Sequence, residues 1–201
     1  MKKLLFLLFI GFSMLKSASI EKLKITNYDL NKINSNLTKN GVLKRLNDYG
    51  KLINKLKNED SELVKINRVN QFFNKFKSVK DKKNYKKADY WATRKEFILK
   101  GSGDCEDYVI AKYFTLIDLG ISPNKLTPIL GKYKKQPHLV LSYRSSKQSL
   151  ILDNINKKVL PLKLTRNFKR EYSIKPFDVK SRDKMSFKIA SYKWHEILEK
   201  Y

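Results

Sequence analysis

Apolar residues recur every three or four positions along several stretches of the chain, which predicts amphipathic helices. These stretches are residues 42–56, 61–76, 104–120 and 189–198. Ser61 opens the second stretch and can serve as its N-cap, and Gly120 is a suitable stop for the third. Between these two helices, residues 79–87 are charged and lose the helical period, so we predict a surface loop there.

The hydrophobic period changes to two beyond Gly120. Short runs rich in Leu, Ile, Val and Tyr alternate with polar turns, which predicts an antiparallel sheet. The runs are residues 126–133, 138–143, 150–153 and 159–162. Helices first and strands afterwards indicate an α+β fold.

The N-terminus has the order of a secretory signal peptide. Lys2 and Lys3 are followed by an apolar run over residues 4–15 and by small residues at 17–19. The run is about twelve residues long, shorter than the roughly twenty that a membrane-spanning helix needs. We therefore predict a signal peptide over residues 1–19 and export of the protein. The remaining chain, residues 20–201, is long enough for a single domain with its own core.

Lysine and arginine outnumber the acidic residues by 44 to 19, which gives a formal net charge of +25. Such a balance is compatible with nucleic acid, an anionic membrane surface or an acidic protein as a partner. The lysines are scattered over the whole chain, however, and no zinc-finger spacing, RNA-recognition motif or glycine-rich phosphate loop accompanies them. The charge alone therefore does not indicate a nucleic-acid-binding site.

Cys105 is the only cysteine of the chain. Exported proteins usually pair their cysteines, so a single thiol is either a small buried apolar side chain or a reactive group. Cys105 follows the break at Gly101, Ser102 and Gly103 and would lie in the first turn of a helix. The free N–H groups and the positive end of a helix stabilise a thiolate there, which suits a nucleophile.

A cysteine nucleophile needs a base, and His138 and His195 are the two histidines. His195 lies in the predicted terminal helix among Lys193, Trp194 and Glu196, where it resembles a surface or packing residue. His138 begins a predicted strand and alternates with Leu139, so its imidazole can project from the sheet on the side opposite the apolar one. Asp153 ends the next strand and can orient the imidazole. Each residue alone is more often structural, but their order is that of papain-like and transglutaminase-like enzymes. We therefore predict a catalytic triad of Cys105, His138 and Asp153.

The same segments resemble a known family. The motifs that carry the resemblance are DYWAT at 89–93, GDCEDY at 103–108, AKY at 111–113, HLVL at 138–141 and LDN at 152–154, with VNQFFN upstream at 69–74. Together they closely resemble the bacterial transglutaminase-like cysteine proteinases of the LapG type, over about residues 40–200. Arg94 departs from the family, in which proline is frequent there, and Leu139 departs where methionine is common. Neither departure touches the predicted chemistry.

The resemblance implies a papain-like or transglutaminase-like fold and a periplasmic, calcium-dependent cysteine endopeptidase. Such an enzyme cuts a very large surface adhesin near its N-terminus, often at an Ala-Ala pair, and so releases cells from a biofilm. A membrane-bound cyclic-di-GMP receptor is implied as an inhibitory partner. Carried over to this chain, the calcium ligands would be Asp104, Glu106 and Asp107, which offer the oxygen atoms that calcium prefers. The alternative is that these carboxylates only complement the positive end of the helix.

Two other functions remain compatible with the sequence alone. A transglutaminase or amidase could use the same triad on a different acyl donor, and crosslinking of a glutamine-bearing protein to an amine without cleavage would identify it. A non-enzymatic basic binding protein would instead have an inert Cys105, which would resist rapid labelling by thiol reagents near neutral pH.

Overall fold

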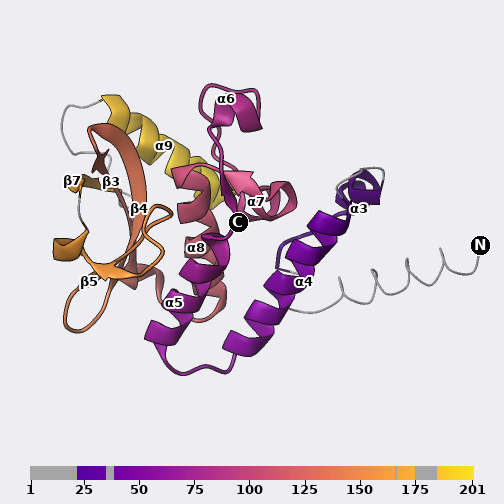
Figure 1. The fold of residues 1–201 in the computed structure, drawn as a ribbon, viewed down its shortest axis with the longest axis horizontal. Helices are drawn as coiled ribbons and strands as arrows, with labels where there is room; N and C mark the ends of the chain where they lie inside the picture. Colours follow the sequence, from indigo (N-terminus) through magenta and orange to yellow (C-terminus); the bar gives the residue numbers. More distant parts are fainter. Residues whose placement is uncertain (1–21, 35–38, 166, 175–184) are drawn as a thin grey trace, which may run out of the picture.

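The computed structural model describes residues 22–34, 39–165, 167–174 and 185–201. A helical half and a sheet half lie side by side, and helix α8 runs between them (Figure 1). Helices come first along the chain and the antiparallel sheet follows, which confirms the predicted α+β fold. The predicted signal peptide, residues 1–19, lies outside the described residues.

The predicted helices 42–56, 104–120 and 189–198 correspond to α4, α8 and α9, and the predicted strands correspond to β3 to β6. The helices are α3 (Asn27–Asn34), α4 (Lys39–Leu56), α5 (Glu62–Phe73), α6 (Asp81–Asn84), α7 (Arg94–Lys100), α8 (Cys105–Asp118) and α9 (Met185–Glu199). The strands are β1 (Lys77–Ser78), β2 (Ser102–Gly103), β3 (Leu126–Tyr133), β4 (Gln136–Arg144), β5 (Ser149–Leu152), β6 (Leu160–Pro161) and β7 (Phe168–Ser173). The sequence did not predict α3, α7 or β7.

Helix α5 is shorter than predicted. The side chain of Ser61 accepts a hydrogen bond from the backbone N–H of Val64 (3.3 Å), as expected for an N-cap. The helix ends at Phe73 with Asn74 as its C-cap, whereas the apolar period predicted helix as far as Phe76. The Phe76 ring still packs on Phe73, with 5.7 Å between ring centroids. The apolar spacing thus predicted correctly that Phe76 is packed with the helix residues, but not that its backbone is helical.

The prediction of a surface loop over residues 79–87 is wrong, because this segment contains the short helix α6. It is tied to the chain just before α8. Strand β1 pairs in parallel with β2, and Asn84 Nδ2 donates to the carbonyl of Ser102 (2.8 Å) while the Ser102 hydroxyl donates back to Asn84 Oδ1 (2.7 Å). These bonds bring α6 to the start of α8, and Asp81 at the start of α6 is buried.

The strands β3 to β7 form a five-stranded antiparallel sheet in the order β6-β5-β4-β3-β7. In the pairing of β4 with β5, Leu141 lies opposite Leu152. Because the strands run in opposite directions, the residue after Leu152 lies toward the start of β4. The sheet register thus brings Asp153 and His138 to the same end of neighbouring strands.

Helix α8 packs against α5 and α7 on the helical side and against β4 on the sheet side. Its residues 107–116 are all buried. Leu139 and Leu141 of β4 belong to the core that surrounds α8, whereas Val140 packs in a second cluster on the other face of the sheet. Burial on all sides fixes the axis of α8 and so the position of its first residue, Cys105.

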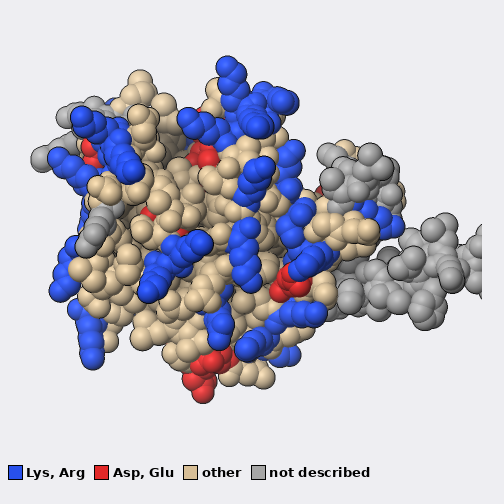
Figure 2. Space-filling view, in the orientation of Figure 1, with Lys and Arg blue, Asp and Glu red and all other residues tan. Residues whose placement is uncertain are grey.

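Basic side chains are spread over the face of the molecule seen in Figure 2 and are not confined to one stripe. This distribution agrees with the scatter of lysine along the sequence. Among the described ranges, no helix has the length and apolar character needed to cross a membrane.

Candidate active site

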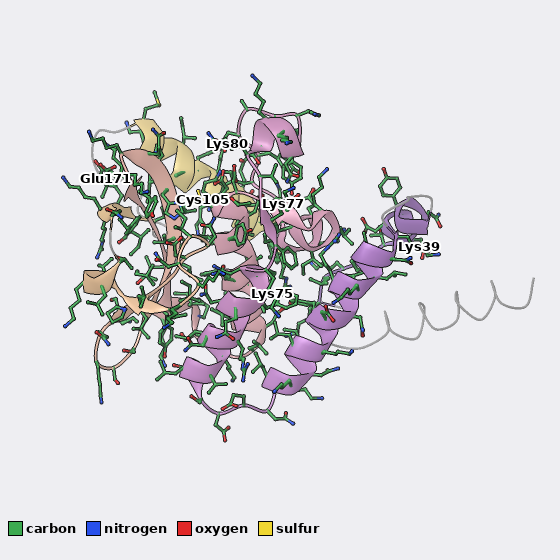
Figure 3. The ribbon with its side chains drawn as sticks, viewed as in Figure 1. Lys39, Lys75, Lys77, Lys80, Cys105 and Glu171 are labelled. Carbon is green, nitrogen blue, oxygen red and sulfur yellow. The ribbon has the colours of Figure 1, made fainter. Side chains whose placement is uncertain are left out.

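Cys105 is the first residue of α8 and lies where the helical half meets the sheet half (Figure 3). Two glycines permit the turn into this helix. Gly101 has a φ of 76°, and a Cβ there would lie 2.6 Å from the Arg45 side chain. A Cβ on Gly103 would lie 2.1 Å from a carboxylate oxygen of Asp107. Side chains at either position would therefore push apart the segment that places Cys105.

The Cys105 thiol is surrounded by acidic groups. Its Sγ donates to Oε2 of Glu106 (3.1 Å), and the backbone N–H of Leu139, the residue after His138, lies against the sulfur. Burial and the charges of Glu106 and Asp104 raise the pKa of the thiol well above its usual value, although the Leu139 N–H opposes this shift. Burial and carboxylates thus outweigh the stabilisation of a thiolate that was expected from the helix start.

His138 and Asp153 form a buried pair. His138 Nε2 lies 2.8 Å from Oδ1 of Asp153, and the two side chains are 6% and 2% exposed. Burial would raise the pKa of Asp153, but the hydrogen bond to His138 and its charge lower that pKa below its ordinary value. Because Asp153 occupies Nε2, Nδ1 is the ring nitrogen available for proton exchange with a thiol.

The surroundings of His138 differ from those predicted. Leu139 faces the main core, so the alternation along β4 is as expected. The opposite side of the sheet is also covered, however, by Phe168 of β7 and by Tyr133, whose rings lie 6.0 and 5.9 Å from the imidazole. The imidazole thus lies on the predicted side of the sheet but is buried there, because Phe168 of the unpredicted strand β7 and Tyr133 of β3 cover it.

Acidic side chains gather around the start of α8 in two overlapping groups. Ligand atoms of Asp81, Asp104 and Asp107 lie within 4.8 Å of one another, and so do those of Asp81, Asp89 and Glu106. The predicted ligands Asp104, Glu106 and Asp107 are thus divided between two groups that share Asp81. The sequence prediction missed Asp81 and Asp89, because only the docking of α6 brings the lysine-rich segment to this place.

Burial raises the pKa values of these carboxyl groups, and their crowding adds to the rise. For Asp104, burial and then the charge of Asp81 raise the pKa to about 6. For Asp107, burial is again the main cause, and the charges of Asp104 and Asp81 add to it, so that the pKa rises to about 8. Burial and Asp104 also raise the pKa of Glu106 well above its usual value. Ionised together, these groups would repel one another strongly.

A hard cation fits the unsatisfied atoms of this cluster. Oδ1 of Asp81 and Oδ1 of Asp104 are buried without a hydrogen-bond partner among the described residues. Asp107, by contrast, accepts bonds from the backbone N–H groups of Ala92 (2.8 Å) and Asp104 (3.3 Å). Calcium takes six to eight oxygen ligands from carboxylates, carbonyls and water. The chemistry of the cluster therefore suits calcium, with Asp107 also serving to brace the helix start.

Lys112 is a buried basic residue that the sequence prediction did not include. Its side chain is 0% exposed, and its Nζ has no hydrogen-bond partner in the described part of the chain. Burial lowers its pKa to about 7, although the charge of Asp153 opposes the shift. Lys112 lies about two turns after Cys105 on the same side of α8. A lysine within the apolar part of a predicted helix was the feature that could have identified it.

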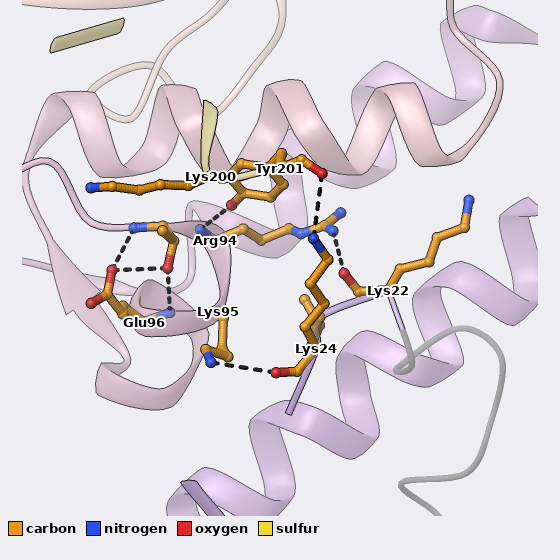
Figure 4. A pocket seen from close by; sticks show the side chains of 9 residues that line it. Lys22, Lys24, Arg94, Lys95, Glu96, Lys200 and Tyr201 are labelled. Atoms are coloured by element: carbon orange, nitrogen blue, oxygen red, sulfur yellow. Dashed lines mark hydrogen bonds between the residues drawn. The ribbon is translucent and has the colours of Figure 1, made fainter. Parts of the chain in front are cut away.

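A separate cavity of about 260 Å³ lies beside α7 and the C-terminus (Figure 4). Arg94, at the start of α7, bonds there to Asp118 (2.6 Å) and to the hydroxyl of Tyr49 (3.0 Å), and Lys95 bonds to Asp29 (3.0 Å). No residue of the Cys105 site lines this cavity. Because the protein itself already pairs these cations, we assign the cavity no ligand.

Comparisons with known proteins agree on one family. The family described as bacterial transglutaminase-like cysteine proteinase (BTLCP) matches residues 44–175. Calcium-bound LapG of Legionella pneumophila is 30% identical with a TM-score of 0.68, over 90% of this chain and 98% of that chain. Two other structures of Legionella pneumophila LapG, one of them EGTA-treated, are 30% and 29% identical with TM-scores of 0.67, over 90% of this chain and 97% of theirs. No curated protein sequence matches. The predicted fold and cysteine protease activity are thus confirmed, and the chain belongs to the bacterial transglutaminase-like cysteine proteinase family.

Proposed function

We propose that this protein is a periplasmic, calcium-dependent cysteine endopeptidase that cleaves the N-terminal region of a large surface adhesin and so promotes biofilm dispersal. One observation carries the proposal. Cys105, at the start of a buried helix, meets the backbone that follows His138, and the imidazole of His138 is bonded to Asp153. These contacts support the roles of nucleophile for Cys105, base for His138 and orienting carboxylate for Asp153 in a cysteine protease fold.

In the proposed reaction, Cys105 Sγ attacks the carbonyl carbon of a peptide bond. His138 Nδ1 accepts the thiol proton and returns it to the nitrogen of the leaving amine as the C–N bond breaks. Water then attacks the resulting thioester and gives a proton to His138. His138 passes this proton to the sulfur as the C–S bond breaks, which releases the carboxylic acid product and restores the thiol. Asp153 holds Nε2 and stabilises the imidazolium, while a backbone N–H at the start of α8 supports the developing oxyanion.

Calcium belongs to the proposal because of the carboxyl groups that flank Cys105. The ion would be held by Asp104, Glu106 and Asp107 of α8 and its N-cap, together with Asp81 and Asp89. Its charge would offset their mutual repulsion and favour the thiolate. One structure of the similar LapG from Legionella pneumophila is calcium-bound and another is EGTA-treated, which supports the same ion here.

The adhesin substrate and the membrane-bound cyclic-di-GMP receptor rest on the family resemblance. The net charge of +25 supports acidic protein partners, because complementary charge speeds their association. Periplasmic location rests on the signal-peptide pattern of residues 1–19.

The activity can be tested with the mature chain, calcium and a recombinant N-terminal segment of the large repetitive adhesin encoded nearest to its gene. We expect one cut in that segment, located by N-terminal sequencing of the products, and no cut by the Cys105→Ala variant. Incorporation of an added amine into the segment without cleavage would instead indicate a transglutaminase.

Location and regulation need separate experiments. Residues 1–19 should export a fused alkaline phosphatase that lacks its own signal, and the same fusion without them should stay inactive. The purified periplasmic domain of the receptor should slow cleavage when it is present in equal amount. No inhibition at any ratio would remove the receptor from the proposal.

A further inference from the structure

The turn that follows β5 carries Asp153 and is held from the helical half of the molecule. Nδ2 of Asn74, the C-cap of α5, donates to the backbone carbonyls of Asp153 (2.7 Å) and Asn156 (3.1 Å). One helical turn earlier, Nδ2 of Asn70 donates to the carbonyl of Lys157 (3.2 Å). Both asparagines belong to the VNQFFN motif, to which the proposed chemistry assigns no role.

The two asparagine side chains act only as donors to this turn. A flipped amide would place Oδ1 against carbonyl oxygens, so the acceptors fix the amide orientation. The Oδ1 atoms of Asn70 and Asn74 have no hydrogen-bond partner within the described ranges. Asn70 is also 0% exposed, so bulk water cannot replace its bond to the turn. The bonds that these side chains make to the rest of the protein thus go to the turn after β5.

The same turn sets the carboxylate of Asp153. Its Oδ2 accepts from Nδ2 of Asn156 (2.9 Å), and its Oδ1 accepts from the backbone N–H of Ile155 (3.1 Å) while it faces His138. Both donors lie in the segment whose carbonyls Asn74 binds. His138, by contrast, is fixed by the pairing of β4 in the sheet. A shift of the turn would therefore move the carboxylate relative to the imidazole.

We propose that Asn74, assisted by Asn70, is a positioning residue for the triad and keeps the Asp153 carboxylate aligned with Nε2 of His138. This inference rests on the triad of the proposed function. Because Asn74 caps α5, a change at the end of this helix would move the Asp153 carboxylate away from His138. Displacements of about 1 Å in a catalytic geometry are enough to remove a large part of the rate.

Replacement of Asn74 can be tested without a protein substrate, by the rate at which iodoacetamide alkylates Cys105 at pH 7 in the mature, calcium-supplied chain. Asn74→Ala keeps an ordinary backbone, since φ is −68° at this position, and should slow alkylation at least fivefold. Asn74→Asp keeps the shape but places an acceptor against two carbonyls, so it should slow alkylation further. Asn67→Ala is the matched control, because Asn67 lies on the same helix and its amide donates only to Leu63 of that helix (2.7 Å).

A double-mutant cycle separates positioning from general loss of structure. If Asn74 acts through Asp153, Asn74→Ala should have no further effect on alkylation in an Asp153→Ala background. If Asn74→Ala slowed alkylation by the same factor in both backgrounds, the inference would be overturned. Should Asn74→Ala fail to fold, Asn74→Ser, which is well tolerated at a helix end but too short to reach both carbonyls, takes its place in the cycle.

The Nε2–H proton resonance of His138 gives a second measurement, in a Cys105→Ala protein that cannot be alkylated. It should shift upfield or broaden in Asn74→Ala and stay unchanged in Asn67→Ala. His138→Ala is the reference for alkylation. An unchanged rate in His138→Ala would overturn the triad and the positioning role together. An unchanged rate in Asn74→Ala beside a slow His138→Ala would overturn the positioning role alone.

Discussion

The two sides of the candidate active site differ in how completely the protein satisfies their charges. On the sheet side, His138 and Asp153 are bonded to each other, and the pKa of Asp153 lies below its usual value. On the helical side, the pKa of Cys105 is raised by burial and by Glu106, and the pKa of Asp107 reaches about 8. Folding therefore pairs the proposed base, His138, with Asp153 and leaves the proposed nucleophile, Cys105, beside carboxyl groups that no cation compensates among the described residues.

This difference indicates where control of the reaction lies. The hydrogen-bonded pair of His138 and Asp153 should keep its geometry as long as the sheet is folded and Asn74 holds the turn after β5. A thiol beside crowded carboxyl groups, however, responds strongly to any cation that binds them. We therefore expect substitutions that disturb the pair of His138 and Asp153, including those of Asn74 on α5, to act through orientation. Changes to the carboxyl groups around Cys105 should act through charge.

The largest effect is expected from loss of the reacting groups themselves. Cys105→Ala and His138→Ala should each lower cleavage by at least about 1000-fold and leave the circular dichroism spectrum unchanged. Asp153→Asn should retain more activity than Asp153→Ala, because an amide can still hold the imidazole. Cleavage by Cys105→Ala at the wild-type rate would contradict the protease mechanism.

Removal of calcium should have the next largest effect and should act on the helical side alone. With EGTA, alkylation of Cys105 at pH 7 should slow about tenfold or more, because each unit of increase in the thiol pKa removes about nine-tenths of the thiolate. Added calcium should restore both labelling and cleavage, and magnesium should restore them poorly because of its stricter octahedral shell. Unchanged rates in EGTA, with no metal in the purified protein, would leave the carboxylates as complements of the helix end.

Asp81→Asn tests whether the carboxylate on α6 belongs to the same site as those on α8. The substitution keeps the shape of the side chain and removes one negative charge, so the calcium dissociation constant measured by calorimetry should rise about tenfold. Asp60→Asn is the control, since Asp60 is exposed and lies before α5. Equal affinities in the two variants would exclude Asp81 from the calcium site.

The last prediction concerns stability and not cleavage, and its subject is Lys112, the buried lysine about two turns after Cys105 on α8. Its pKa is about 7 in the fold and about 10.4 in an unfolded chain, so the folded state binds fewer protons over this range and stability rises with pH. Lys112→Met removes the buried charge. Because the wild type should lose roughly 4 kcal/mol of stability as the pH is lowered from 10 to 6, the melting temperature of the variant relative to wild type should increase by about 10 °C over this range.

The control for this substitution is Lys51→Met on the exposed face of α4. It should show no such trend with pH. A constant difference between Lys112→Met and wild type from pH 6 to pH 10 would contradict a lysine that titrates near neutrality.

The elements that the sequence predicted are those with long, regular periods. The helices at α4 and α8 and the strands β3 to β6 were recognised because each repeats one burial pattern over several residues. Strand β7 was missed because charged residues interrupt FKREYS at the sheet edge, and α6 and α7 were missed because they are too short to show a period.

The sequence by itself determined the α+β order, the glycine break before Cys105 and the candidate triad residues, because these depend on neighbours within one element. Only the tertiary structure brought Asp81 to the start of α8, covered His138 with β7 and joined Asn74 to the turn of Asp153. The sequence predicted that the start of a helix lowers the pKa of the Cys105 thiol, but in the folded protein burial and Glu106 raise it. The physical reason is that burial and charge act through space, so the properties of a site depend on side chains that meet only after the chain has folded.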